Sequence, residues 1–210
     1  RDFAPVVLAT RAPNVLVVNP AVPPRSVKEL IALAKAKPGE LNYATGATGG
    51  PPHLSGELLK AMTGINIVRV PFKGGGPAVI GLLGNEVQLM FATASSVASQ
   101  VKAGKLIALA VTSAQPSTLF PGLPTVAATV PGYESSAMNG LFAPAGTPAR
   151  IVNLLSQETA RYINRPEVKE KLFATGVEAV GSSPQQATAT LKAEIARWSK
   201  VIKDAGIRED

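Results

Sequence analysis

The sequence predicts an α/β fold with a mainly parallel sheet that is covered by helices on both faces. Short apolar stretches rich in β-branched residues alternate with segments of helical periodicity along most of the 210 residues. Helix-start and helix-stop signals separate them, such as the capping box Ser26-Val27-Lys28-Glu29 and the stop at Pro38-Gly39. Because parallel strands need a crossover helix between them, this alternation favours a mainly parallel sheet.

The first half of the chain is expected to alternate regularly between strands and helices. Strands are expected at residues 15–18, 41–44, 65–70, 87–91 and 106–111. Helices are expected from the capping box to Lys37, from Pro51-Pro52 to a C-cap at Gly64, over 77–83, and over 96–103.

The second half is expected to be irregular before helices return. Prolines interrupt residues 115–132, where only 125–129 fits a helix, and residues 140–143 fit a strand. Helices are expected from Pro148 to about Asn164, from Pro166 to Gly176, and after a capping box at residues 183–186. The apolar stripe of the last helix predicts core packing, and its members are Leu191, Ile195, Trp198 and Ile202.

Composition excludes several classes of function. Hydrophobic residues make up 46% and charged residues 17% of the chain, which is typical of a folded globular protein. The net charge is +7, but the basic residues are dispersed, so we expect a solvated basic surface and no nucleic-acid partner. With no cysteine and one histidine, the chain cannot build a thiolate or multi-histidine metal site, and no metal or cofactor is expected.

The most informative segment is the loop that follows the strand at 41–44. It feeds a helix that begins at two prolines, and a helix N-terminus attracts anions. No lysine follows its last glycine, so it is not a P-loop, and the glycine spacing does not fit a dinucleotide fingerprint. The segment predicts a cradle for a carboxylate or another small anion, made by Thr45, Gly46, Ala47, Thr48, Gly49 and Gly50.

A second loop of the same kind follows the next expected strand. It reads Lys73-Gly74-Gly75-Gly76, and Pro77 opens the helix after it. Three glycines allow the backbone to approach a ligand closely, and the lysine supplies a full charge. Because successive parallel strands place such loops side by side at one sheet edge, the pair indicates a small-anion site.

Six segments of the chain carry a resemblance to a known family. They follow one another in the order of the Bug-type extracytoplasmic solute receptors of tripartite tricarboxylate transporters, and the resemblance covers essentially all of the chain. The segments are Val17-Val18-Asn19-Pro20, residues 41–58, Val70-Pro71-Phe72-Lys73-Gly74-Gly75-Gly76-Pro77-Ala78, residues 106–113, Leu123-Pro124-Thr125-Val126 and residues 140–148.

The resemblance implies a type II periplasmic-binding-protein (Venus-flytrap) fold of two lobes that closes around a small carboxylate. It also implies a periplasmic location and delivery of the ligand to a membrane permease. By position, the first loop would bind one carboxylate, while Lys73, Gly74 and Gly75 would line the adjacent wall. His53 would support the first loop by a hydrogen bond from inside the helix.

Family members often carry an aspartate directly after the strand that ends Met-Phe. Here Met90-Phe91 is followed by Ala92 and Thr93, which we include among the candidate ligand-binding residues. Without that acid, an amino-acid ligand is disfavoured, whereas a di- or tricarboxylate or an aromatic acid is favoured.

The start of the chain resembles a segment that lies well inside a full receptor, and no signal-peptide pattern follows Arg1. We therefore expect an intact second lobe at 15–136 and an incomplete first lobe made of 1–14 and 137–210. An incomplete lobe is expected to expose sheet edge and apolar helix faces, which favours self-association and weak ligand binding.

Two other classes of function compete with a receptor. The effector-sensing domain of a transcription regulator shares the two-lobed architecture. An enzyme is disfavoured, because His53 and Ser55 are two residues apart on a helix and point in different directions. The chain also has no Gly-x-Ser-x-Gly elbow, and its acidic residues are dispersed.

Overall fold

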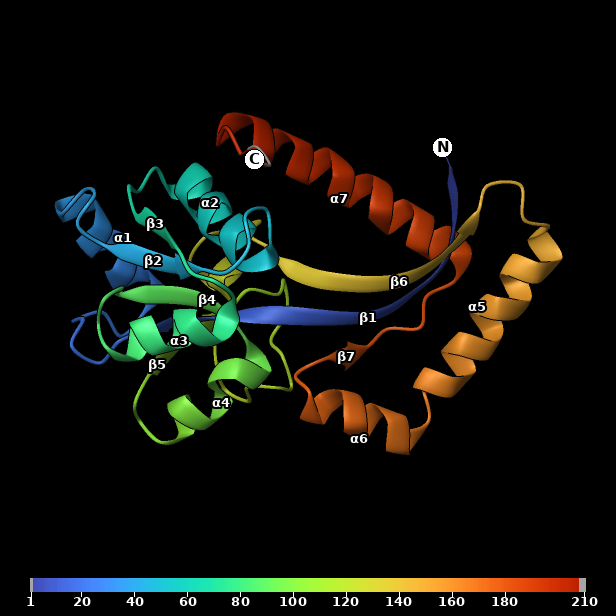
Figure 1. Cartoon of the computed structure of the whole chain (residues 1–210), viewed down its shortest axis with the longest axis horizontal. Helices are drawn as coiled ribbons and strands as arrows, with labels where there is room; N and C mark the ends of the chain where they lie inside the picture. Colours follow the sequence, from blue (N-terminus) through green and yellow to red (C-terminus); the bar gives the residue numbers. More distant parts are fainter. Residues whose placement is uncertain (1, 208–210) are drawn as a thin grey trace. The chain divides into compact units, whose positions relative to one another are not determined.

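The computed structural model of the protein describes residues 2–207 (Figure 1). The chain divides into two compact units: unit 1 comprises residues 1–12 and 137–200, and unit 2 comprises 13–136 and 201–210. The lobe boundaries expected from the sequence, 1–14 with 137–210 and 15–136, remain a prediction. Their outer ends, at Arg1 and residues 208–210, lie outside the described residues.

Unit 2 is built on a five-stranded sheet in the order β3-β2-β4-β1-β5. Its strands are β2 (Asn42–Thr45), β3 (Val68–Pro71), β4 (Leu89–Thr93), β5 (Ile107–Val111) and the end of β1 (Phe3–Val18). β2 is parallel to β3 and to β4, whereas β1 is antiparallel to β4 and to β5. Strands β2 to β5 therefore share one direction, and the expectation of a mainly parallel α/β sheet is confirmed.

Apolar side chains bury both faces of this sheet. The helices of unit 2 are α1 (Val27–Ala36), α2 (Pro51–Thr63), α3 (Gly75–Leu83) and α4 (Ala94–Lys102), followed by a 3₁₀ turn at Val126–Ala128. Leu82 of α3 and Val97 of α4 join one core cluster with Val17 and Met90 of the sheet. Tyr43 lies on the other face, against α2. Burial on both faces explains the unbroken apolar runs of these strands.

Local signals position the helix ends of unit 2. Ser26 caps α1, its hydroxyl accepting from the backbone N–H of Glu29. The Glu29 carboxylate accepts from the N–H of Arg25 rather than Ser26, so the expected capping box is shifted by one residue. α2 ends at Gly64, which has a φ of 68° as the left-handed C-cap requires.

Unit 1 contains the start of β1, nearly all of β6 (Ser136–Pro144), β7 (Glu178–Ala179), the helices α5 (Ala149–Ile163) and α6 (Pro166–Ala174), and α7 (Pro184–Asp204) as far as Lys200. β6 and β7 both pair with β1. The capping box of α7 is formed as expected: Gln186 N–H donates to the Ser183 hydroxyl, and the Gln186 side chain accepts from Ser183 N–H.

Two element predictions need correction. β1 runs from Phe3 rather than from Val15, because its first half pairs with β6 and β7. Residues 65–67 are not part of a strand, although Ile65 and Ile67 are buried, so their apolar character reflects burial alone.

The stripe of the last helix is not core. Ile195 is 57% exposed and Ile202 is 37% exposed, and Trp198 is half-buried with its indole N–H donating to Glu194. Helical periodicity predicts which residues share a face, but it does not predict what covers that face.

Candidate anion-binding site

Three helices of unit 2 begin at one edge of its sheet (Figure 1). α2, α3 and α4 follow β2, β3 and β4, which are parallel neighbours in the order β3-β2-β4. The carboxyl ends of these strands therefore lie together, and the loop after β2 lies between the other two. Open α/β sheets bind ligands at such an edge.

The two glycine loops predicted from the sequence lie against each other. A Cβ atom on Gly46 would be 3.3 Å from the carbonyl carbon of Gly74 and 3.5 Å from the amide nitrogen of Gly75. Phe72 N–H also donates to the carbonyl of Thr45 at 2.8 Å. A side chain at position 46 would press against this backbone, so the glycine there has a packing role.

Within the first loop, internal bonds use several of the donors that the sequence assigned to a ligand. Gly50 N–H donates to Ala47, Gly49 N–H donates to His53 Nδ1, and neither Pro51 nor Pro52 has an N–H. The exposed amides of Ala47 and Thr48 have no acceptor among the described residues. The amide of Gly46, a half-buried residue, likewise has no acceptor there, so the amides of Gly46, Ala47 and Thr48 are the loop donors left for an anion.

The second loop is open. Gly74 caps α3 with a φ of 104°, and Cβ atoms at Gly74, Gly75 or Gly76 would meet nothing within 4 Å. The amides of Gly75 and Gly76 are the first two of α3 and are exposed, so the positive end of this helix faces solvent. Lys73 is exposed beside them.

The two threonines of the first loop differ in position. Thr45 is fully buried at the end of β2, whereas Thr48 is exposed. Both hydroxyls accept hydrogen bonds from Arg69 of β3, at 2.9 Å from Nε to Thr45 and 2.9 Å from Nη2 to Thr48. The Thr45 hydroxyl therefore acts inside the fold, and only the Thr48 hydroxyl can reach a ligand.

Sequence reasoning missed Arg69. A signal was present, since it is a lone cation between two valines in a short strand directly before the second loop. Its partners, however, come from the register of β3 on β2, which sets Arg69 beside Tyr43.

His53 supports the first loop as expected. The ring is buried, and Nδ1 accepts from Gly49 N–H at 3.0 Å. Burial, and next the positive charge of Arg69, hold the pKa of His53 below its usual value. A neutral ring is what this bond requires, because a protonated Nδ1 has no lone pair to accept with. Whether His53 also contacts a ligand remains a prediction.

A buried hydrogen-bonded cluster lies behind the loop. Tyr43 donates its hydroxyl to Glu57 Oε1 at 2.6 Å, and Lys60 Nζ lies 2.9 Å from the same oxygen. Burial and the bond to Glu57 raise the pKa of Tyr43, so the phenol remains protonated. The cluster fixes α2 against β2.

The structure places the last two candidate residues differently. Thr93 is exposed at the N-cap position of α4, where its side chain makes no capping hydrogen bond, so it lies at the edge shared with the glycine loops. Ala92 is fully buried and packs in the core with Val15 and Val111. Its side chain therefore cannot touch a solute, and we do not propose Ala92 as a contact.

Ser55 is not arranged as a nucleophile. It is fully buried, and its hydroxyl is bonded to Asn14, Ser135 and the carbonyl of Pro51. Within residues 2–207 there is no cluster of three or more metal-ligating side chains. No helix in the same range has the length and apolar character to cross a membrane.

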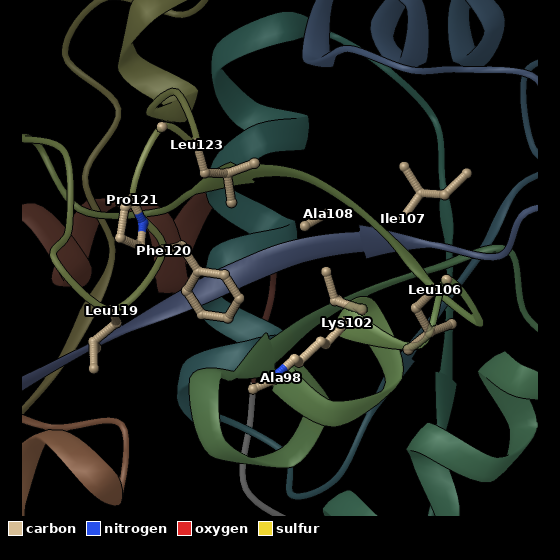
Figure 2. A pocket seen from close by; sticks show the side chains of 12 residues that line it. Ala98, Lys102, Leu106, Ile107, Ala108, Leu119, Phe120, Pro121 and Leu123 are labelled. Atoms are coloured by element: carbon tan, nitrogen blue, oxygen red, sulfur yellow. The ribbon is translucent and has the colours of Figure 1, made fainter.

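A separate pocket of unit 2 lies along β5, the outer strand of the sheet farthest from β3 (Figure 2). Figure 2 shows Leu106, Phe120 and Leu123 around it, with Lys102 at its side. The lining is otherwise apolar, so this pocket lacks the donor set that a carboxylate needs.

The fold is that of periplasmic solute-binding receptors, since solved structures of such proteins match 97% and 99% of this chain. The chain belongs to the tripartite tricarboxylate transporter receptor family, whose family model matches residues 1–207. This is a family of receptors and not of enzymes, as the sequence predicted.

Three relatives illustrate the similarity. Protein BugT of Bordetella pertussis is 36% identical over 208 residues, which cover 99% of this chain and 64% of BugT. The structure of R. palustris Rpa4515 with adipate matches with a TM-score of 0.83 and 41% identity, covering 98% of this chain and 69% of that one. MatC from Rhodopseudomonas palustris with bound malate matches with a TM-score of 0.78 and 28% identity, covering 95% and 69%.

The chain spans somewhat less than two thirds of the length of the curated relatives it matches first, 61% and 64%.

Proposed function

We propose that this chain is the ligand-holding part of a periplasmic receptor that binds a small carboxylate and delivers it to a tripartite tricarboxylate transporter permease. The observation that carries the proposal is the pair of adjoining glycine loops, which leave free amides at the edge of the sheet. Amides at helix N-termini hold carboxylates without a catalytic group.

The chemistry of the edge favours a dicarboxylate. The first loop offers the amides of Ala47 and Thr48 with the Thr48 hydroxyl, and the second offers the amides of Gly75 and Gly76 beside Lys73. The similar proteins solved with adipate and malate carry ligands of this class.

Thr93, which is exposed at the start of α4, carries no carboxylate to bind an ammonium group. A ligand that carries an amino group would have to bury or solvate that charge without a partner, which is costly. Plain di- or tricarboxylates, and aromatic acids, are therefore proposed in preference to amino acids. The permease and the periplasmic location are proposed from the family.

Isothermal titration calorimetry with adipate, malate, citrate and benzoate tests the proposal, with glutamate and inorganic phosphate as comparison ligands. We expect heat of binding for at least one carboxylate and weaker binding of glutamate than of an unsubstituted dicarboxylate. A thermal-shift series should agree, because a ligand at a hundred times its Kd stabilises the fold by about 2.7 kcal/mol. Absence of binding to every carboxylate at millimolar concentration would contradict the proposal.

A pair of variants tests the amides themselves. Gly75 is the first residue of α3, where proline is tolerated, so Gly75→Pro removes one proposed donor and keeps the helix start. Gly75→Ala keeps the amide and adds only a methyl group to open space. We expect Gly75→Pro to weaken binding about tenfold and Gly75→Ala to weaken it much less. Equal losses in both variants would argue against amide recognition.

A further inference from the structure

Arg69 bonds the last residue of β2 to the exposed part of the first loop. Its Nε donates to the hydroxyl of Thr45 and its Nη2 to the hydroxyl of Thr48, each at 2.9 Å. One planar guanidinium therefore spans the loop from its buried start to the threonine that faces solvent. Lysine could not make both bonds in this fixed geometry, because only arginine presents a rigid fork of donors.

The direction of these bonds decides where the threonine protons go. A guanidinium has no acceptor, so both hydroxyl oxygens accept and each hydroxyl keeps its own hydrogen to donate. For Thr48 the hydrogen is turned away from Arg69, on an exposed residue whose own amide has no acceptor among the described residues. Amide and hydroxyl of one residue are thus both left as donors.

The charge of Arg69 is not neutralised by the nearby acid. The Glu57 carboxylate is bonded to Tyr43 and to Lys60, and within residues 2–207 the structure gives Arg69 no salt bridge. Arg69 is only partly exposed, and an anion brought to the loop would meet a cation that water screens incompletely. Burial lowers the pKa of His53 most and the charge of Arg69 lowers it next, in keeping with a positive field at this loop.

We propose that Arg69 is the positioning residue of the carboxylate site: it fixes the loop at residues 46–50, aims the Thr48 hydroxyl hydrogen at the ligand, and adds positive charge behind the loop. The ligand class is a small carboxylate, so the inference rests on the proposed function. It adds to the site a side chain that acts mainly through Thr48, in addition to the backbone amides.

The test measures the Kd of adipate by calorimetry for the wild-type chain and the variants Arg69→Gln, Arg69→Lys, Thr48→Val and Thr48→Ser. Arg69→Gln should raise the Kd about tenfold or more, because it removes charge-assisted bonds to the loop. Arg69→Lys should not restore wild-type affinity. Thr48→Val should raise the Kd, and Thr48→Ser, which keeps the hydroxyl, should stay close to wild type.

The double variant Arg69→Gln/Thr48→Val separates positioning from general damage. If Arg69 acts through Thr48, the double variant should bind about as weakly as the weaker single variant, rather than showing the product of both losses. The Kd of Arg69→Gln should also depend less on salt than that of the wild type. Lys105→Gln is the matched control, since it removes the same charge from an exposed residue. Lys105 lies just before β5, the outer strand of the sheet farthest from β3.

The outcomes are distinguishable. If the wild-type chain binds no carboxylate, the proposed function fails and this inference fails with it. If the wild type binds adipate and Arg69→Gln stays within twofold of it, the inference alone is overturned. A multiplicative loss in the double variant overturns the positioning role. If Arg69→Gln does not fold, equal affinities for wild type and Thr48→Val overturn the inference.

Discussion

The hydroxyl of Ser55 lies 2.8 Å from the hydroxyl of Ser135, and both residues are buried. Ser55 is in α2, five residues after the loop, while Ser135 directly precedes β6. Asn14 of β1 donates to the same Ser55 hydroxyl, and Tyr133 donates to the Ser55 carbonyl. The helix that begins at the candidate site is thus hydrogen-bonded to two of the three segments at which the chain crosses between the units.

Removal of the Ser55 hydroxyl is expected to destabilise the protein. Ser55→Ala leaves the Asn14 amide and the Ser135 hydroxyl short of a buried partner, which costs about 1–3 kcal/mol. Urea denaturation measures the free energy of unfolding, and Ser99→Ala, at an exposed position of α4, is the control expected to change it little. Equal effects of the two substitutions would show that the buried network contributes nothing.

A second prediction concerns Gly56, which lies against the ring of Tyr43. A Cβ atom there would be 2.5 Å from Tyr43 Cε2, and the ring is fully buried with its hydroxyl bonded to Glu57. Since the ring cannot move aside without losing that bond, Gly56→Ala should cost about 1–3 kcal/mol.

Gly76→Ala makes the same change in a helix where the new Cβ meets nothing within 4 Å. It should be neutral or stabilise by up to about 1 kcal/mol, because glycine is the poorer helix former. The prediction for Gly56 fails if both alanine variants unfold at the same urea concentration.

The third prediction is a pH dependence that arises from His53. Its pKa in the folded protein is lowered from 6.5, so the folded state favours the neutral ring. As the pH falls through about 6.5, the unfolded chain takes up this proton first, and the free energy of unfolding decreases. The contribution is fully present above that pH, and its loss is complete once the pH falls below the lowered pKa.

The comparison variant is His53→Asn, whose Oδ1 can replace Nδ1 as the acceptor of Gly49 N–H but does not titrate. The difference in stability between wild type and His53→Asn should shrink or reverse between pH 7 and pH 5. A difference that stays constant over this range would contradict the role given to the ring.

Much of the fold, and of the candidate site at the carboxyl ends of β2, β3 and β4, could be predicted from the sequence, because local rules decide both. The two prolines at the start of α2, Gly64 after it, and the Ser183 capping box each act within a few residues, and all are found where expected. The meeting of the two glycine loops was also predictable, since adjacent parallel strands bring their carboxyl ends together.

Features that depend on distant partners could not be predicted in this way. Arg69 meets Thr45 and Thr48 only through the register of β3 on β2. The burial of Ala92 depends on the packing of β4 against neighbouring strands and helices that are distant in the sequence. Exposure of Ile195 could not be inferred from the apolar stripe of α7. Spacing along a helix shows which residues share a face, but it does not show whether other residues pack on that face.

The last prediction concerns association of the chain with itself through unit 1. α5 buries Val152 on one side, but it also exposes a second apolar row at helical spacing. That row consists of Ile151, Leu154 and Leu155, which are 41%, 57% and 45% exposed. Contiguous apolar surface of this kind tends to be buried by association. We therefore expect the apparent mass from light scattering to rise with protein concentration.

A charge placed in the row should oppose the association. Leu154→Glu should lower the apparent mass towards that of a monomer, because burying an unpaired carboxylate is costly. Gln157→Glu adds the same charge at an exposed polar position of the same helix and should leave association unchanged. A wild-type chain that scatters as a monomer at every concentration would refute self-association. Equal effects of the two glutamates would instead point to net charge, rather than this apolar row, as the cause.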